Sequence, residues 1–161
     1  MQTSTTHGMR LSTLLAGLME TPLVHDPEIS GITLDSRAVR QGWLFIAVPG
    51  ARTDGRAYIA GAYSRGAAAA VYEVNGFEPD ARSANAIGVR ALRQHIGAIA
   101  DRFYGAPSRK LKVVGVTGTN GKTTTTHLLA QVLDRPDARR GLIGTLGSGF
   151  PGQLDPSVHT T

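Results

Sequence analysis

The chain has 161 residues, of which 41% are hydrophobic, and it carries a formal net charge of +5 at pH 7. A chain of this length can bury a hydrophobic core and form one domain or two small ones. It contains no cysteine, which excludes a disulfide framework and a thiolate metal site. No apolar run approaches the ~20 residues of a membrane span and the N-terminus is polar, so we expect a cytoplasmic location.

The positive charge does not by itself predict nucleic-acid binding. The 17 Lys and Arg residues are spread along the chain, and the one Trp, four Tyr and four Phe do not interleave with a basic stripe. A basic surface is usually a solvated face, and an anionic nucleotide substrate accounts for part of the excess charge. We expect no nucleic-acid partner, and no obligate protein partner is evident.

The apolar spacing and the turn residues predict an α/β fold in two parts. In the first part we expect a helix at 11–18, strands at 29–34 and 43–48, a helix at 58–65, strands at 67–72 and 86–89, and a helix at 90–104. Gly and Pro in residues 105–108 break this pattern, so we place a domain boundary at residue 107. Residues 1–107 then form a small α/β domain. Residues 108–161 begin a second domain, whose parallel sheet contains strands at 111–114 and 140–145.

The most informative segment is the glycine-rich run Gly115–Thr126, which lies between a β-prone run and a leucine-rich stripe with helical spacing. Such a turn points the free N–H groups of a helix N-terminus at an anion. Its Gly-Lys-Thr ending supplies a lysine for the β- and γ-phosphates and a hydroxyl for Mg²⁺. The general phosphate-loop pattern requires glycine where this chain has Val116, so only a narrower pattern fits. The alternative is a glycine turn that starts a helix by chance.

We therefore predict a phosphate site in this loop, with Gly118 and Gly121 allowing close approach of the backbone, Lys122 as the cation and Thr123 as a ligand of Mg²⁺.

The run Thr117–Thr123 resembles the nucleotide loop of the Mur ligases, the ATP-dependent amide-forming enzymes that add amino acids to the peptidoglycan precursor. The run Gly31–Gly50, continuing to Arg56, resembles the N-terminal UDP-binding domain of that family. Asn120 and Gly141–Gly147 resemble the member that adds the third residue. The ligase that adds the terminal dipeptide is the alternative within the family, and it typically lacks Asn120.

The resemblance, which extends from about residue 29 to 161, implies a two-step reaction. ATP phosphorylates the carboxylate of UDP-N-acetylmuramoyl-L-alanyl-D-glutamate, and the amino group of meso-diaminopimelate or L-lysine then displaces phosphate to form an amide. ATP and Mg²⁺ are the implied cofactors, and Lys122 is the implied catalytic cation. The residues implied to bind ATP are Gly118, Thr119, Asn120, Gly121, Lys122, Thr123 and Thr124. The family also needs a carbamylated lysine, further Mg²⁺ ligands and a C-terminal domain, which we expect to lie beyond Thr161. We expect this chain to hold only the N-terminal part of the ligase and to be inactive alone.

The resemblance also implies a set of residues that contact the UDP substrate: Leu34, Ser36, Ala51, Arg52, Thr53, His159, Thr160 and Thr161. From residue chemistry alone, Asp35 and Ser36 are common turn formers, and His159 is more often merely solvated. Two other classes of protein stay open. One is a phosphate-loop ATPase or switch unrelated to cell-wall synthesis, and the other is a protein that binds nucleotide without turnover.

Overall fold

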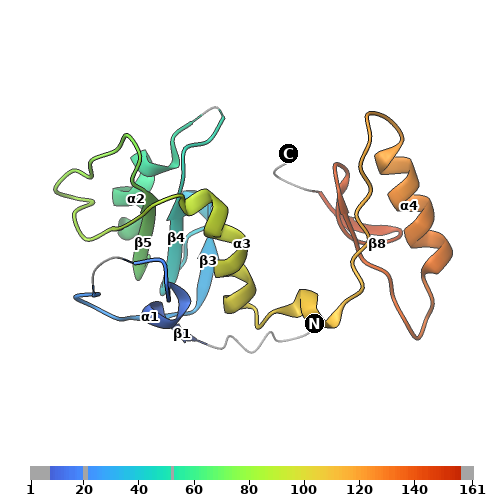
Figure 1. Cartoon of the computed structure of the whole chain (residues 1–161), viewed down its shortest axis with the longest axis horizontal. Helices are drawn as coiled ribbons and strands as arrows, with labels where there is room; N and C mark the ends of the chain where they lie inside the picture. The colour runs from blue at the N-terminus through green and yellow to red at the C-terminus, as the bar shows by residue number, and fades with distance from the viewer. Residues whose placement is uncertain (1–7, 20–21, 52, 157–161) are drawn as a thin grey trace. The chain divides into compact units, whose positions relative to one another are not determined.

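The structure is a computed structural model that describes residues 8–19, 22–51 and 53–156. The chain divides into two compact units, Met1–Leu111 and Lys112–Thr161 (Figure 1). Within the described ranges no helix is long and apolar enough to cross a membrane.

The first unit is built on a four-stranded parallel sheet. Its strands follow one another in space as in sequence, in the order β3 (Gly31–Thr33), β4 (Trp43–Ala47), β5 (Ala69–Glu73) and β6 (Ile87–Val89). The connections carry the 3-10 helices η1 (Ser36–Ala38) and η2 (Gly55–Tyr58) and the α-helix α2 (Ile59–Ser64), and α3 (Leu92–Phe103) follows β6. The predicted α/β class is confirmed, and most of these elements lie where the sequence predicts them.

Successive side chains of a strand point to opposite faces of the sheet, and both faces are buried here. Leu44 and Ile46 of β4 belong to a cluster with residues of α3 and of the short helix α1 (Leu11–Leu14). Phe45 and Ala47 belong to a second cluster with Ile59 and Ala62 of α2. The unit therefore has helices packed against both faces of its central sheet.

The N-terminal elements differ in detail from the prediction. The expected strand at 29–34 is two strands that meet at Ser30: β2 (Glu28–Ile29), which pairs antiparallel with β1 (Met9–Arg10), and β3 of the parallel sheet. The expected helix at 11–18 ends at Leu14 and continues only as a turn. Gly17 has φ +76°, a left-handed conformation that ends helices.

The second unit contains α4 (Lys122–Leu133) and a three-stranded sheet of β7 (Leu142–Gly144), β8 (Gly147–Phe150) and β9 (Gln153–Asp155). Both strand pairs of this sheet are antiparallel. The prediction that residues 140–145 belong to a parallel sheet is therefore wrong for the described part of this unit. Only two residues join β7 to β8, so these strands form an antiparallel hairpin.

The predicted strand at 111–114 is also absent. After the 3-10 helix η3 (Pro107–Lys110), the chain is irregular up to the glycine-rich loop, and no described segment pairs with it. Val113 and Val114 are 75% and 67% exposed. Residues with high β-propensity form a strand only where a neighbouring strand and burial support them, and neither is present around these valines among the described residues.

Truncating a core residue should destabilise the first unit strongly. Phe45 is 1% exposed, and Phe45→Ala should lower the free energy of unfolding by about 3–5 kcal/mol, because it removes the ring and leaves a cavity. Urea unfolding followed by fluorescence of Trp43, the only tryptophan, measures this change. Val24 is 91% exposed, so the control Val24→Ala should stay within about 0.5 kcal/mol of the parent. Equal effects of the two substitutions would contradict the assigned core.

Candidate functional site

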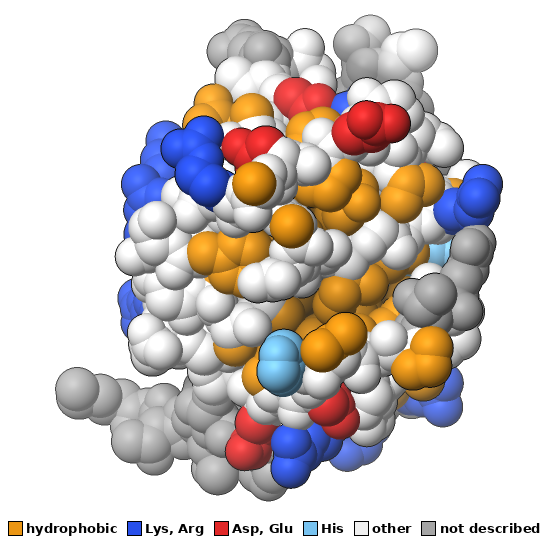
Figure 2. All heavy atoms as spheres, turned by 90° about the vertical axis from the view of Figure 1, so that its left-hand side faces the viewer, with side chains coloured by type: hydrophobic (Ala, Val, Ile, Leu, Met, Phe, Trp, Pro, Cys, Tyr) orange, Lys and Arg blue, Asp and Glu red, His pale blue; other side chains and the backbone are white. Residues whose placement is uncertain are grey.

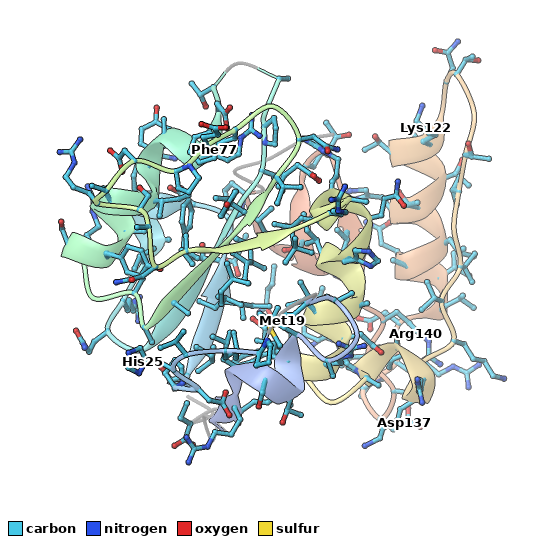
Figure 3. All side chains as sticks on the ribbon, turned by 60° about the vertical axis from the view of Figure 1, so that its left-hand side comes forward. Met19, His25, Phe77, Lys122, Asp137 and Arg140 are labelled. Atoms are coloured by element: carbon cyan, nitrogen blue, oxygen red, sulfur yellow. The ribbon has the colours of Figure 1, made fainter. Side chains whose placement is uncertain are left out.

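The glycine-rich loop leads directly into α4. Gly118 has φ +147° and Gly121 has φ +77°, backbone conformations that side chains disfavour, and Gly121 is the residue that caps the helix. Lys122 is the first residue of α4, and Figure 3 shows it at the start of that helix. The residues of the loop are exposed, so its backbone N–H groups and the N-terminal end of the helix are accessible to an anion.

The side chain of Lys122 folds back over this loop. Its ammonium group donates to the carbonyl oxygens of Gly118 and Thr119, the latter at 3.3 Å. A phosphate oxygen is a stronger acceptor than a carbonyl, because it carries charge. The lysine is therefore held at the loop in a position from which a bound phosphate can recruit it.

The four threonines that follow Lys122 differ in their surroundings. Thr126 donates its hydroxyl to the carbonyl oxygens of Lys122 and Thr123, both at 2.9 Å, and so supports the first turn of the helix. Thr123 is half-buried and Thr124 is exposed. The Thr123 hydroxyl has no partner among the described residues, which fits the hydroxyl ligand that a phosphate-loop Mg²⁺ requires.

A second set of predicted residues lies at the carboxyl edge of the parallel sheet in the first unit. Leu34 and Ser36 follow β3, while Ala51 and Thr53 follow β4. Because β3 and β4 are adjacent and parallel, the segments that follow them begin at the same edge, where open α/β sheets bind ligands. Arg52, His159, Thr160 and Thr161 lie outside the described residues.

The turn after β3 is held by Asp35. Its carboxylate accepts a hydrogen bond from the backbone N–H of Arg37 at 2.9 Å and so caps η1. The same carboxylate binds the Arg37 guanidinium through Nε and through Nη2 at 2.8 Å. Asp35 therefore has the turn-forming role expected from its chemistry. Leu34 is 51% exposed, and the Ser36 hydroxyl has no described partner, so both side chains are available to a ligand.

The loop after β4 is a tight turn closed by backbone contacts. Gly50 N–H donates to the carbonyl of Thr53 at 2.9 Å, and Gly55 N–H donates to the carbonyl of Val48 at 3.1 Å. A side chain at either glycine would meet these carbonyl oxygens, at 2.6 and 2.8 Å from its Cβ. Ala51 and Thr53 are exposed and belong to the segment that these two hydrogen bonds close.

Arg56 ties this turn to the end of β5. Its guanidinium binds the Asp54 carboxylate through Nε and Nη2, and its Nη1 donates to the carbonyls of Glu73 at 3.0 Å and Asn75 at 2.6 Å. The cation also stacks on Phe77, with 4.9 Å from its central carbon to the ring centroid. Arg56 is only 7% exposed, and its hydrogen bonds lower the pKa of the Asp54 carboxyl.

The same edge is connected to α3 through Glu73, the last residue of β5. Glu73 is buried, and its carboxylate accepts from the backbone N–H groups of Asn75 at 3.4 Å and Ala91 at 3.2 Å. Ala91 precedes α3 in a left-handed conformation. Phe77 and His25 lie at opposite ends of the first unit in Figure 3, and Phe77 marks the end that carries these contacts.

Our reading of the sequence did not assign roles to Arg56, Glu73 or Phe77. A signal for Arg56 was present, since Asp54 and Arg56 have the same spacing as Asp35 and Arg37 and both pairs follow a predicted strand. No comparable signal exists for Glu73 or Phe77, because their contacts join segments far apart in the chain.

The first unit also has a groove of about 930 Å³, lined by both apolar and polar residues. Figure 2 shows apolar side chains gathered on one face of the molecule. The groove is lined by the segment around Leu18 and Leu23, by the start of β5 and by the segment that leads into β6. None of the described site residues lines it. The groove is therefore separate from the carboxyl-edge site.

The structure is that of an α/β protein with an exposed glycine-rich loop at a helix N-terminus in one unit and a candidate ligand site at the sheet edge of the other. Residues 28–104 match the family described as "Mur ligase family, catalytic domain", and residues 116–161 match "Mur ligase middle domain". The chain belongs to the Mur ligase family, as the sequence motifs predict.

Relatives of known name support the same assignment. The chain is 54% identical over 134 residues to a UDP-N-acetylmuramoyl-L-alanyl-D-glutamate--2,6-diaminopimelate ligase of Ectopseudomonas mendocina, covering 83% of this chain and 28% of the relative. It is 51% identical over 154 residues to the enzyme of that name from Pseudomonas putida, covering 95% of this chain and 30% of the relative. A solved structure with this enzyme name matches with a TM-score of 0.68 and 27% identity, over 93% of this chain and 30% of that structure. The chain thus spans about 30% of the length of these relatives.

Removing the Arg56 guanidinium should destabilise the first unit. Arg56→Met leaves the carbonyls of Glu73 and Asn75 without their donor, and we expect a loss of about 2–4 kcal/mol in the free energy of unfolding. Urea unfolding followed by Trp43 fluorescence measures the loss. The matched control is Arg37→Met: Arg37 forms the same pair with aspartate but is 75% exposed, so its change in the free energy of unfolding should be much smaller than that of Arg56→Met. If Arg56→Met proved as mild as this control, Arg56 would not be the connection described here.

Proposed function

We propose that this chain is the N-terminal part of an ATP-dependent ligase that adds diaminopimelate, as the third amino acid, to UDP-N-acetylmuramoyl-L-alanyl-D-glutamate. The observation that carries the proposal is the pairing, in one chain of this family, of an open phosphate loop with a carboxyl-edge site that exposes Leu34 and leaves the Ser36 hydroxyl available. The names of the relatives supply the substrate and the amino acid. We also propose a cytoplasmic location and a domain boundary at residue 107, close to the division between the two compact units at Leu111.

In this proposal the two units have separate tasks. Leu34, Ser36 and the loop Ala51–Thr53 contact the uridine diphosphate group, and His159–Thr161 contact the muramoyl peptide. The ATP phosphates bind the loop Gly118–Thr124, where the backbone N–H groups of the turn and the N-terminal end of α4 favour negative charge.

The chemical step requires that two anions, the γ-phosphate of ATP and the substrate carboxylate, come together. Lys122 lowers their repulsion by donating to phosphate oxygens, for which it leaves the carbonyls of Gly118 and Thr119. Thr123 offers its hydroxyl to Mg²⁺, which, when bound, neutralises the phosphate charge. The terminal phosphoryl group passes to the carboxylate with release of ADP, and the amine then forms the amide with release of phosphate.

Phosphate binding should depend on Lys122. Lys122→Ala should weaken ATP binding at least about thirtyfold, because it removes the only ammonium group at the loop among the described residues, and ligase turnover of the complete gene product should be lost. Isothermal titration of the chain with Mg-ATP measures the affinity. Lys112→Ala, an exposed lysine of the same unit outside the loop, is the matched control and should bind ATP as the parent does. Unchanged ATP affinity in Lys122→Ala would contradict the proposal that the glycine-rich loop binds the phosphates of ATP.

The activity itself is tested on the gene product as the source cell makes it. Incubation with ATP, UDP-N-acetylmuramoyl-L-alanyl-D-glutamate and diaminopimelate should release ADP and yield the UDP-linked tripeptide, detected by mass spectrometry. Hydrolysis of ATP that ignores both other substrates would favour an unrelated phosphate-loop ATPase. Binding of ATP with no release of phosphate under full substrate would favour a protein without turnover.

A further inference from the structure

The carboxyl edge of the parallel sheet carries two copies of one small arrangement. Asp35 with Arg37 and Asp54 with Arg56 each have an aspartate two residues before an arginine, at the start of a 3-10 helix that follows a parallel strand. In both, the carboxylate accepts from the backbone N–H of the arginine, at 2.9 and 3.0 Å. We call each arrangement an Asp-x-Arg clip.

The two clips hold the guanidinium in the same way. Nε lies 2.9 Å from Oδ1 in the Asp35 clip and 3.0 Å in the Asp54 clip, and Nη2 lies 2.8 and 2.7 Å from Oδ2. The carboxylate thus occupies the edge formed by Nε and Nη2, and Nη1 is left for another acceptor. In both clips the free end of the cation is oriented before any ligand arrives.

What the free end meets differs between the clips. Nη1 of Arg56 is occupied by two carbonyl oxygens, of Glu73 and Asn75, and this arginine is 7% exposed. Nη1 of Arg37 has no acceptor among the described residues, and this arginine is 75% exposed. One clip is therefore filled by the protein, whereas the other offers an oriented donor to solvent, directly after Leu34 and Ser36.

We propose that Arg37 binds the diphosphate of the nucleotide substrate, in the position that the carbonyls of Glu73 and Asn75 take at Arg56. The inference rests on the proposed function, because it assumes that a uridine diphosphate group occupies this edge. Guanidinium N–H groups can only donate, so the ligand must bring oxygen acceptors, and charged phosphate oxygens are stronger acceptors than carbonyls.

The pairing with Asp35 also limits how strongly Arg37 attracts a phosphate group. Asp35 offsets part of the positive charge of Arg37, so the contact acts through oriented hydrogen bonds more than through long-range attraction. Because the side chain is already held by Asp35, little conformational entropy is lost when the ligand binds. Hydrogen bonding to Asp35 raises the pKa of Arg37, which keeps the cation charged.

The test compares the affinities of uridine, UMP and UDP for the 161-residue chain by isothermal titration. Arg37→Gln should weaken UDP binding about tenfold, weaken UMP binding less and leave uridine within about twofold. Arg37→Lys keeps the charge but cannot form the two-point contact with Asp35, so it should restore only part of the UDP affinity. Thermal melting of each variant confirms that the exposed substitution leaves the fold intact.

The matched control is Arg82→Gln. Arg82 also follows an aspartate by two residues, pairs with it at 3.4 Å and is 82% exposed, but it lies in the loop between β5 and β6. This variant should bind all three ligands as the parent does.

Two results would overturn the inference: unchanged UDP affinity in Arg37→Gln, or an equal loss for uridine and UDP, which would mean that Arg37 acts only through the turn that carries Ser36. Failure of the proposed function has a different signature. In that case the folded parent chain itself binds neither uridine nor UDP, and the inference about Arg37 is contradicted together with the proposed function.

Discussion

The contacts of the Arg56 guanidinium organise the carboxyl edge of the first unit. One buried cation joins the turn after β4, through Asp54, to the end of β5, through the carbonyls of Glu73 and Asn75. Burying a charge is costly unless it is paired and hydrogen-bonded, and here all three nitrogen atoms of the guanidinium have acceptors. Arg56 therefore connects the segment after β4 to the end of β5. The loop proposed to contact the UDP group directly precedes the Asp54–Arg56 pair.

Comparison with the Arg56 clip shows which part of the Arg37 guanidinium is open to a ligand. Both arginines are oriented by an aspartate in the same geometry, yet only one has its remaining donor occupied by the protein. The Asp54–Arg56 clip thus connects parts of the protein, whereas the Asp35–Arg37 clip is the one at which we propose ligand binding. Ser36 lies next to Arg37, and its hydroxyl has no partner among the described residues.

Much of the first unit could be predicted from its sequence because its signals are local. The continuous apolar run of β4, the left-handed Gly66 after α2 and the helical spacing of α3 each act over a few residues. Errors arose where pairing decides the structure. Ser30 separates two strands because β2 and β3 join different sheets, and Val113 and Val114 lack a described neighbour with which to form a strand. The strand predicted at 140–145 pairs with β8, for which the sequence analysis predicted no strand, and the short connection makes this pairing antiparallel.

The same distinction applies to the sites. The glycine-rich loop is a contiguous run, so the sequence predicts its place directly before a helix, and the structure shows it at the start of α4. Phosphate binding at this loop remains a proposal. The roles of Arg56 and Glu73 depend on acceptors and donors 17 to 19 residues away, and a single sequence does not reveal such contacts. The substrate contacts at Leu34 and Ser36 were inferred from family resemblance, and they remain proposals.

The central claim is that UDP and ATP bind at two separate places in this chain, the carboxyl edge of the first unit and the phosphate loop of the second. The most direct test is an amide chemical-shift titration of the 161-residue chain by NMR, first with UDP and then with Mg-ATP. The account predicts that UDP shifts the signals of residues 34–37 and 50–54, and that Mg-ATP shifts those of residues 118–124. UDP shifts confined to the phosphate loop, or to the groove around Leu18 and Leu23, would contradict it.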